Sequence, residues 1–262
     1  MAEIPPEVLA RLERGELETA NLVEWLAIDQ RRLLEAVLEQ LEWDLECAEL
    51  TATAQQLSEQ GIVARTAGLG RALGEATSGP GRVRRGRVLR RALATHGSDA
   101  VRTWAAFAVQ VDELDLEHRL DRARPFAADG HQGVRELAWL SVRDAIIAAP
   151  LEAVELLAPW TRCADPNLRR FAIEATRPRG VWCSHLRTFR DEPELAQGLL
   201  EPLRADPSKY VRDSVANWLN DASKDRPEFV VELTDRWSVE SPTRETQSLV
   251  RRALRTLRKA GA

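Results

Sequence analysis

The sequence contains little of what builds β-hairpins. Tyrosine occurs once in 262 residues, and Asp129-Gly130 is the single Asn-Gly or Asp-Gly pair, the commonest tight hairpin turn. Alanine, leucine, arginine and glutamate dominate instead, and these residues favour helices. The composition therefore predicts an all-α protein, and a hydrophobic share of 44% is enough for a continuous core.

Disulfides, a signal peptide and a membrane span are not predicted either. The three cysteines, Cys47, Cys163 and Cys183, cannot form a closed set of bridges, which favours a reducing, cytoplasmic location. The start of the sequence has neither a basic stretch nor an apolar core of the signal-peptide kind. No apolar run approaches the roughly 20 residues of a membrane helix. We expect a monomer with no membrane partner.

Charge is divided unevenly along the chain. The net charge is −4, yet residues 1–60 hold four Lys/Arg against 14 Asp/Glu and the rest hold 33 against 27. Apolar residues at three- and four-residue steps predict two or three helices in the acidic segment. We interpret residues 1–76 as an acidic helical cap, because the end units of a repeat array need a polar outer face. A turn-rich connector at 77–81 then leads into residues 77–262, a repeat region continuous with the cap in a single elongated domain.

An apolar residue followed by arginine recurs along the second part of the chain. The steps are Val101-Arg102, Val134-Arg135, Leu168-Arg169 and Val211-Arg212, at separations of 33, 34 and 43 residues. Asp-Pro precedes the last two steps, at 165–166 and 206–207, which fits an N-cap followed by a first-turn proline. The spacing predicts an α-α superhelix (solenoid) of helical hairpin repeats, with an insertion at residues 176–182 in the longest interval.

A dense run of arginines follows the connector. Residues 82–91 contain six arginines. A solvated helix start explains such a run, and contact with a phosphate backbone explains it equally well.

Common catalytic motifs are lacking, whereas acids and tryptophans recur at repeated places. No phosphate-binding glycine loop, zinc-type cysteine pair or Ser-His-Asp arrangement occurs, so neither a cofactor nor a metal site is predicted. Glu136, Glu174 and Asp221 lie two, six and ten residues after the apolar residue of their own steps, on helices expected to line the inner face. Tryptophans accompany them at positions 104, 139, 182 and 218. Core packing explains each tryptophan taken singly, and stacking on a ligand is the alternative.

Two long motifs surround the last two acids. Residues 169–179 read Arg-Arg-Phe-Ala-Ile-Glu-Ala-Thr-Arg-Pro-Arg, and residues 214–225 read Ser-Val-Ala-Asn-Trp-Leu-Asn-Asp-Ala-Ser-Lys-Asp. Both motifs resemble those of the HEAT-like alkylpurine DNA glycosylases AlkC and AlkD, and AlkC more closely. The resemblance covers about residues 130–235 well, residues 95–130 loosely and the acidic segment hardly at all.

The resemblance implies hydrolysis of the N-glycosidic bond of a cationic N3-alkylated base, such as 3-methyladenine, in double-stranded DNA. Glu174 and Asp221 fall on acids of the family's active-site region, and Glu136 is aligned with a third acid from an earlier repeat. No lysine is placed for a Schiff base, so a monofunctional enzyme is expected. The residues expected to contact DNA are Arg177, Arg179, Lys209 and Arg212 on the backbone, and Trp139, Trp182 and Trp218 on the base or sugar.

Two other functions remain open from the sequence. One is a non-catalytic HEAT-like protein that binds damaged or branched DNA. The other is a helical scaffold that binds proteins and has no affinity for plain duplex DNA.

Overall fold

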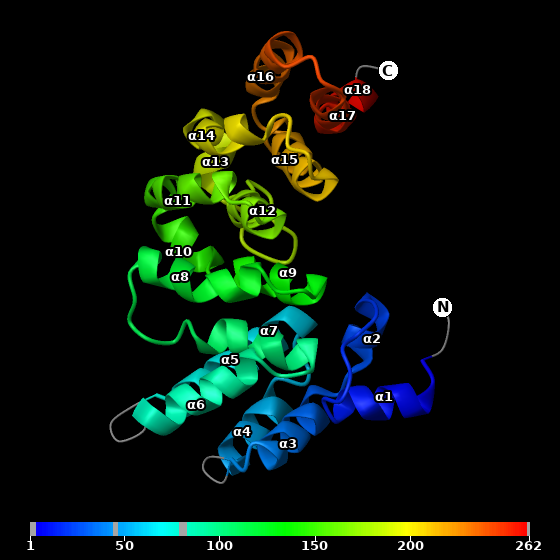
Figure 1. Ribbon diagram of the computed structural model, residues 1–262, viewed down its shortest axis with the longest axis vertical. Helices are drawn as coiled ribbons and strands as arrows, with labels where there is room; N and C mark the ends of the chain where they lie inside the picture. Colours follow the sequence, from blue (N-terminus) through cyan, green and yellow to red (C-terminus); the bar gives the residue numbers. More distant parts are fainter. Residues whose placement is uncertain (1–3, 44–46, 79–82, 261–262) are drawn as a thin grey trace. The chain divides into compact units, whose positions relative to one another are not determined.

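The computed structural model describes residues 4–43, 47–78 and 83–260, which form helices joined by turns and contain no strand (Figure 1). The all-helical prediction is therefore confirmed. Within these ranges, no helix combines the length and the apolar character needed to cross a bilayer. The chain divides into two compact units, residues 1–141 and residues 142–262. Residues 79–81 of the connector predicted at 77–81 lie outside the described residues.

Unit 1 contains the acidic segment and the first repeats. Its helices are α1 (Pro6–Glu13), α2 (Leu22–Ala27), α3 (Gln30–Gln40), α4 (Cys47–Gln56), α5 (Ile62–Ala76), α6 (Val83–Ala94), α7 (Asp99–Ala108), α8 (Leu116–Ala127) and α9 (Gln132–Ser141). The acidic segment thus holds four helices, α1 to α4, instead of two or three. Helices α5, α7 and α9 pack side by side, while α6 and α8 each pack against this layer. The two-layer arrangement is that of stacked helical hairpins.

A buried polar cluster joins the acidic segment to the repeats. Asp99 is fully buried at the start of α7 and accepts hydrogen bonds from the backbone N–H and the hydroxyl of Thr19, at 2.8 and 2.7 Å. The His131 ring also contacts Thr19, with its Nε2 atom 2.8 Å from the Thr19 carbonyl oxygen. Arg102 on α7 pairs with Glu18. These contacts fix the turn between α1 and α2 to the start of α7, whereas the role of the acidic segment as a cap with a border after residue 76 stays a prediction.

The arginine run forms an amphipathic helix. Leu89 and Leu93 are buried side chains of α6, while Arg84, Arg87 and Arg91 are exposed. Arg82 lies outside the described residues. The arginines therefore form a solvated helix face, which was one of the two explanations of the run.

Unit 2 carries the remaining repeats. Its helices are α10 (Arg143–Ala148), α11 (Pro150–Leu157), η1 (Ala158–Arg162), α12 (Pro166–Ala175), α13 (Arg187–Asp191), η2 (Pro193–Ala196), α14 (Gln197–Leu200), η3 (Glu201–Leu203), α15 (Lys209–Ala222), α16 (Pro227–Glu240), α17 (Arg244–Ala253) and α18 (Arg255–Ala260). Helices α12, α15 and α17 pack in sequence as the inner layer. The predicted insertion is confirmed, because residues 176–186 form a non-helical segment after α12.

The recurring arginine has a structural role. Each apolar-Arg step occupies the third and fourth residues of its helix, in α7, α9, α12 and α15. In every copy one terminal nitrogen of the arginine donates to the carbonyl oxygens five and six residues earlier; the arginines are Arg102, Arg135, Arg169 and Arg212. The arginine therefore ties the turn before each helix to its first turn. Arg212 holds its own turn as its three counterparts do, and its predicted contact with the DNA backbone stays a prediction.

The two Asp-Pro pairs differ in their role. Asp165 is the N-cap of α12 and its carboxylate accepts from the Asn167 N–H at 2.8 Å, as predicted. Asp206 is not an N-cap, because α15 begins two residues later than the motif suggests, after Ser208. Its carboxylate accepts instead from the Ser208 N–H at 2.8 Å and from Arg169 at 2.7 and 3.0 Å. Asp206 thus links two successive repeats.

Candidate functional site

Glu174 and Asp221 lie on neighbouring inner helices of unit 2. Glu174 stands in the last turn of α12 and Asp221 in the last turn of α15, and the two helices pack against each other. Both side chains are on the buried side of their helices, with exposures of only 2% and 4%. A buried carboxylate without partners would be strongly destabilising, so its hydrogen bonds decide whether it remains charged.

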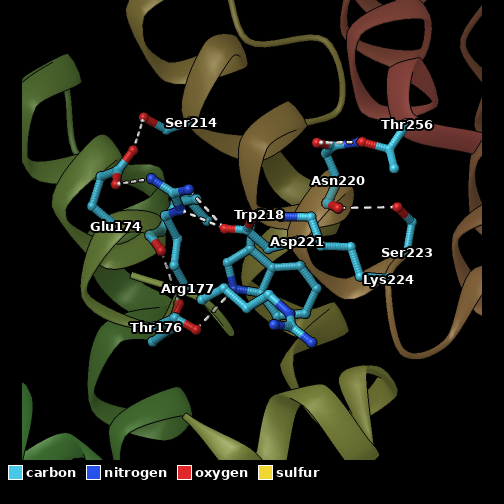
Figure 2. A network of polar contacts seen from close by, with 12 residues as sticks. Glu174, Thr176, Arg177, Ser214, Trp218, Asn220, Asp221, Ser223, Lys224 and Thr256 are labelled. Atoms are coloured by element: carbon cyan, nitrogen blue, oxygen red, sulfur yellow. Dashed lines mark hydrogen bonds and ion pairs between the residues drawn. The ribbon is translucent and has the colours of Figure 1, made fainter. Parts of the chain in front are cut away.

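Arg177 joins the two acids. Its guanidinium donates from one terminal nitrogen to Glu174 Oε2 at 3.2 Å. From Nε and the other terminal nitrogen it donates to Asp221 Oδ2, at 3.0 and 2.7 Å (Figure 2). Arg177 was predicted to contact the DNA backbone. The structure places it instead as the shared counterion of both candidate catalytic acids, because α12 ends just before it and the chain turns back between the two helices.

Other donors complete the surroundings of the acids. The Ser214 hydroxyl donates to Glu174 Oε1 at 2.6 Å, and the Lys224 ammonium donates to Asp221 Oδ1 at 3.3 Å (Figure 2). Arg170 lies 3.5 Å from Glu174 Oε1 and also covers the Tyr210 ring, 4.3 Å from its centroid. Every carboxylate oxygen of the pair therefore has a donor. An ionised carboxylate offers about four acceptor positions, so each acid retains capacity for one further donor, such as a water molecule.

The same acids act on Arg177. Burial lowers the pKa of Arg177, but the charges of Glu174 and Asp221 and their hydrogen bonds outweigh this effect and leave the pKa raised. The guanidinium therefore stays charged, and the three groups form a network with one positive and two negative charges.

A buried arginine fixes the segment that follows α12. Arg143 in α10 is 1% exposed and donates to the carbonyl oxygens of Ala175, Arg177 and Ser184, at 2.7, 2.6 and 3.2 Å. Burial lowers the pKa of Arg143. Its position holds the backbone of Arg177 beside the acids. No sequence signal pointed to Arg143, whereas Ser214 and Lys224 lie inside the second motif and were overlooked there.

Arg179 belongs to a second ion cluster. It donates to both oxygens of Asp225, at 2.8 and 2.9 Å from one nitrogen, and Arg190 donates to the same carboxylate at 2.8 and 3.1 Å. The hydrogen bonds from Arg190, and then those from Arg179, hold the pKa of Asp225 at about 2 although burial opposes them. The cluster ties the inserted segment to the end of α15. Arg179 remains partly exposed, so its predicted contact with DNA stays a prediction.

The tryptophans separate into buried and exposed residues. All eight lie in the described ranges, and Trp182, at 59%, is the exposed one, whereas the others are at most 5% exposed. The prediction that Trp218 contacts a base or sugar is wrong, because Trp218 is fully buried. Its indole N–H donates to the Thr176 carbonyl oxygen at 3.0 Å and its ring packs on Phe189. Trp182 has a φ of 61°, a backbone conformation that costs a non-glycine residue about 1 kcal/mol or more.

Glu136 and Trp139 lie in unit 1. Trp139 is 4% exposed and its indole N–H donates to Glu136 Oε2 at 2.9 Å. The packing explanation therefore holds for the Trp139 ring, and its predicted contact with the base or sugar is corrected. The assignment of Glu136 as a third acid of the site stays a prediction.

Two features concern ligands: the predicted DNA contact of Lys209 and the side chains that could hold a metal ion. Lys209 is exposed at the start of α15 and pairs with Asp213 at 2.5 Å, so its contact with DNA also stays a prediction. In the part of the chain that the structure describes, no group of three or more His, Cys, Asp or Glu side chains is arranged to hold a metal ion.

Comparisons with known proteins give two kinds of likeness. No protein-family model matches the chain. The sequence is 30% identical over 155 residues to the uncharacterized protein YhaZ of Bacillus subtilis (strain 168), across 59% of this chain and 42% of YhaZ. The chain thus spans less than half the length of this curated relative.

Solved structures extend the likeness to the fold. The Pseudomonas fluorescens alkylpurine DNA glycosylase AlkC, solved bound to DNA containing an abasic site analog, matches with a TM-score of 0.70 and 26% identity. The match covers 89% of this chain and 64% of AlkC. AlkD2 from Streptococcus mutans matches with a TM-score of 0.60 and 23% identity over 84% of this chain and 97% of AlkD2, which shows a shared fold. The predicted helical-repeat fold class is thereby confirmed. By its motifs, its repeats and these structures, the chain resembles the AlkC and AlkD glycosylase family, and AlkC more closely than AlkD2.

Proposed function

We propose that the chain is a monofunctional DNA glycosylase that hydrolyses the N-glycosidic bond of cationic N3-alkylated bases of the 3-methyladenine class. The observation that carries the proposal is the pair of buried carboxylates, Glu174 and Asp221, on consecutive inner helices. Both acids belong to the motifs that resemble those of the AlkC and AlkD family, and the fold of the chain is similar to that of AlkC.

The chemistry of the substrate suits such a pair. An alkylated base already carries a positive charge, so it leaves readily and needs little acid catalysis. The sugar becomes positively charged as the bond breaks, and fixed carboxylates stabilise that charge. Each acid also has one acceptor position left for the water that attacks the sugar. Glu174 and Asp221 are the proposed catalytic residues, with Glu136 as a third.

Contacts with duplex DNA are part of the proposal. Trp182 presents an exposed ring on the inserted segment that also carries Arg177, and exposed Lys209 offers a backbone contact. Such contacts carry no base sequence information, so recognition of the lesion is expected to be independent of sequence. We also propose a monomer in the cytoplasm, a location supported by three cysteines that form no disulfide.

An excision assay tests the proposal. Duplexes that each carry one methylated base are incubated with the chain, and released bases are identified by chromatography. Release of 3-methyladenine with intact strands is the expected result. No base release from any of the substrates would overturn the proposal.

The burial of the acids favours a second candidate, a non-catalytic protein that binds damaged or branched DNA. Carboxylates that are at most 4% exposed and have a donor on every oxygen also serve to hold two repeats together. This candidate predicts salt-sensitive binding to branched DNA without base release.

A further inference from the structure

Asn220, next to Asp221 in α15, connects the acid pair to helices α17 and α18. This side chain is 3% exposed, and its amide nitrogen donates to the Ala253 carbonyl oxygen at 3.0 Å and to the Thr256 hydroxyl at 2.9 Å (Figure 2). The two hydrogen bonds hold the junction of α17 and α18 against the end of α15. Because Asp221 follows Asn220 directly, Arg255, between the two anchored positions, is brought to the same end of α15.

Arg255 is electrostatically part of the acid site. Burial and neighbouring Arg252 lower the pKa of Arg255, while Asp221 raises it and Arg177 lowers it further. Its one described hydrogen bond goes to the Arg252 carbonyl oxygen at 2.9 Å, which leaves most of its donors available. Sequence comparison did not indicate Arg255, since the resemblance to AlkC in the motifs ends near residue 235.

Positive charge exceeds negative charge around the two acids. Among the described residues, Glu174 and Asp221 face four cations: Arg170, Arg177, Lys224 and Arg255. Arg177 is shared by both acids and Arg170 covers Tyr210. Lys224, with a side chain 42% exposed, touches Asp221 through one donor. The surplus therefore lies on Lys224 and Arg255, whose side chains are partly exposed.

We propose that Lys224 and Arg255 bind a phosphodiester group of a DNA strand next to Asp221. The proposal rests on the proposed function and adds two binding residues to it. A phosphate bound there offsets the surplus charge and is attracted by two cations, which outweighs its repulsion from Asp221. The phosphate then holds the adjoining sugar close to the carboxylates. This arrangement explains how two acids operate beside a polyanion.

The alternative is that both cations are structural. Lys224 lies just past the C-terminus of α15, where a positive charge interacts favourably with the helix dipole. A purely structural role affects stability without changing the salt dependence of DNA binding, so the two explanations are separable.

Equilibrium binding of the full chain to an undamaged duplex, measured by fluorescence anisotropy over a series of salt concentrations, tests the proposal. Lys224→Ala and Arg255→Ala are expected to weaken binding several-fold at low salt. Each is also expected to reduce the slope of log K against log salt by about one, the effect of losing one phosphate contact. Arg255→Lys keeps the charge and should retain most of the slope. This variant can still be measured if Arg255→Ala folds poorly. The matched control is Arg258→Ala, an exposed arginine of the same helix, which should bind as the unmodified chain does.

Slopes for Lys224→Ala and Arg255→Ala that equal that of Arg258→Ala would overturn the proposal, and so would an unmodified chain that fails to bind duplex at low salt. The excision assay tests the proposed glycosylase activity independently of these binding measurements. A chain that binds duplex with normal slopes but releases no base contradicts the glycosylase, while the phosphate site is still judged by the variants.

Discussion

Arg177 donates two hydrogen bonds to a single oxygen of Asp221, from Nε at 3.0 Å and from a terminal nitrogen at 2.7 Å. The same guanidinium reaches Glu174 on the preceding inner helix. One side chain from the inserted segment therefore neutralises part of the charge of both acids. The insertion is an internal part of the site, and its removal would expose the acids to each other.

Neutral replacements of the acids test catalysis directly. Glu174→Gln and Asp221→Asn keep the size of each side chain but remove the charge that would stabilise an oxocarbenium-like sugar. We expect single-turnover base release to fall by about 100-fold or more in each variant, by analogy with the loss of one fixed electrostatic contact. DNA affinity should stay equal or rise, because a negative charge near phosphates is lost. Unchanged turnover in both variants would contradict the assigned roles.

Removal of Arg177 should destabilise unit 2. Arg177→Ala leaves two buried carboxylates with too few donors, which typically costs about 3–5 kcal/mol. Arg177→Lys keeps the charge but cannot make the same forked contacts, so a smaller loss is expected. Urea denaturation followed by circular dichroism measures both. Arg187→Ala is the control, since that arginine is 89% exposed and pairs only with a nearby acid. Equal stability of the Arg177→Ala and control variants would show that the bridge contributes little.

Trp182 and Trp218 should behave in opposite ways. Trp218→Ala removes a fully buried ring and is expected to cost about 3–5 kcal/mol of stability. Trp182→Ala removes an exposed ring and should leave the melting temperature nearly unchanged. If Trp182 contacts the base or sugar, its loss lowers base release several-fold. Thermal melts and excision rates of the two variants are compared, and a large drop in melting temperature for Trp182→Ala would place that ring in the core.

Asp225 gives the structure a defined acid sensitivity. Its pKa falls from 3.8 to about 2 on folding, chiefly through Arg190, so the ionised form stabilises the folded state. This contribution is present above about pH 4 and is lost as the pH falls toward 2. Asp225→Asn should cost about 1 kcal/mol near neutral pH, because the cluster is partly exposed to solvent. The variant should also lose less stability than the unmodified chain between pH 4 and 2, as measured by urea denaturation. Parallel pH curves would rule out this role for Asp225.

Much of the architecture was predictable from local patterns. The apolar-Arg steps marked the same place in four helices, because the buried residue and the turn-binding arginine are both set by positions within one helical hairpin. The N-cap at Asp165 was likewise local. Asp206 departed from the pattern because Arg169 of the preceding repeat binds its carboxylate, a contact between residues far apart in sequence.

The side chains around the acids were less predictable. The motifs singled out Glu174 and Asp221, but Arg177 was expected on phosphate and Trp218 on a base or sugar, whereas both contact other parts of the protein. Arginine next to a turn is equally suited to phosphate and to carboxylate, and tryptophan to a ligand and to a core. Arg143 and Arg255 carried no sequence signal, since each acts on residues more than 30 positions away.

The sequence by itself determined the helices, the repeat spacing and the two acids, because periodicity, capping and motif composition are properties of neighbouring residues. The tertiary structure alone decided which charges meet. Packing of α12 against α15 places Arg177 between two buried carboxylates, and the low polarity of that interior makes these partners, instead of solvent, dominate the electrostatic interactions of the site.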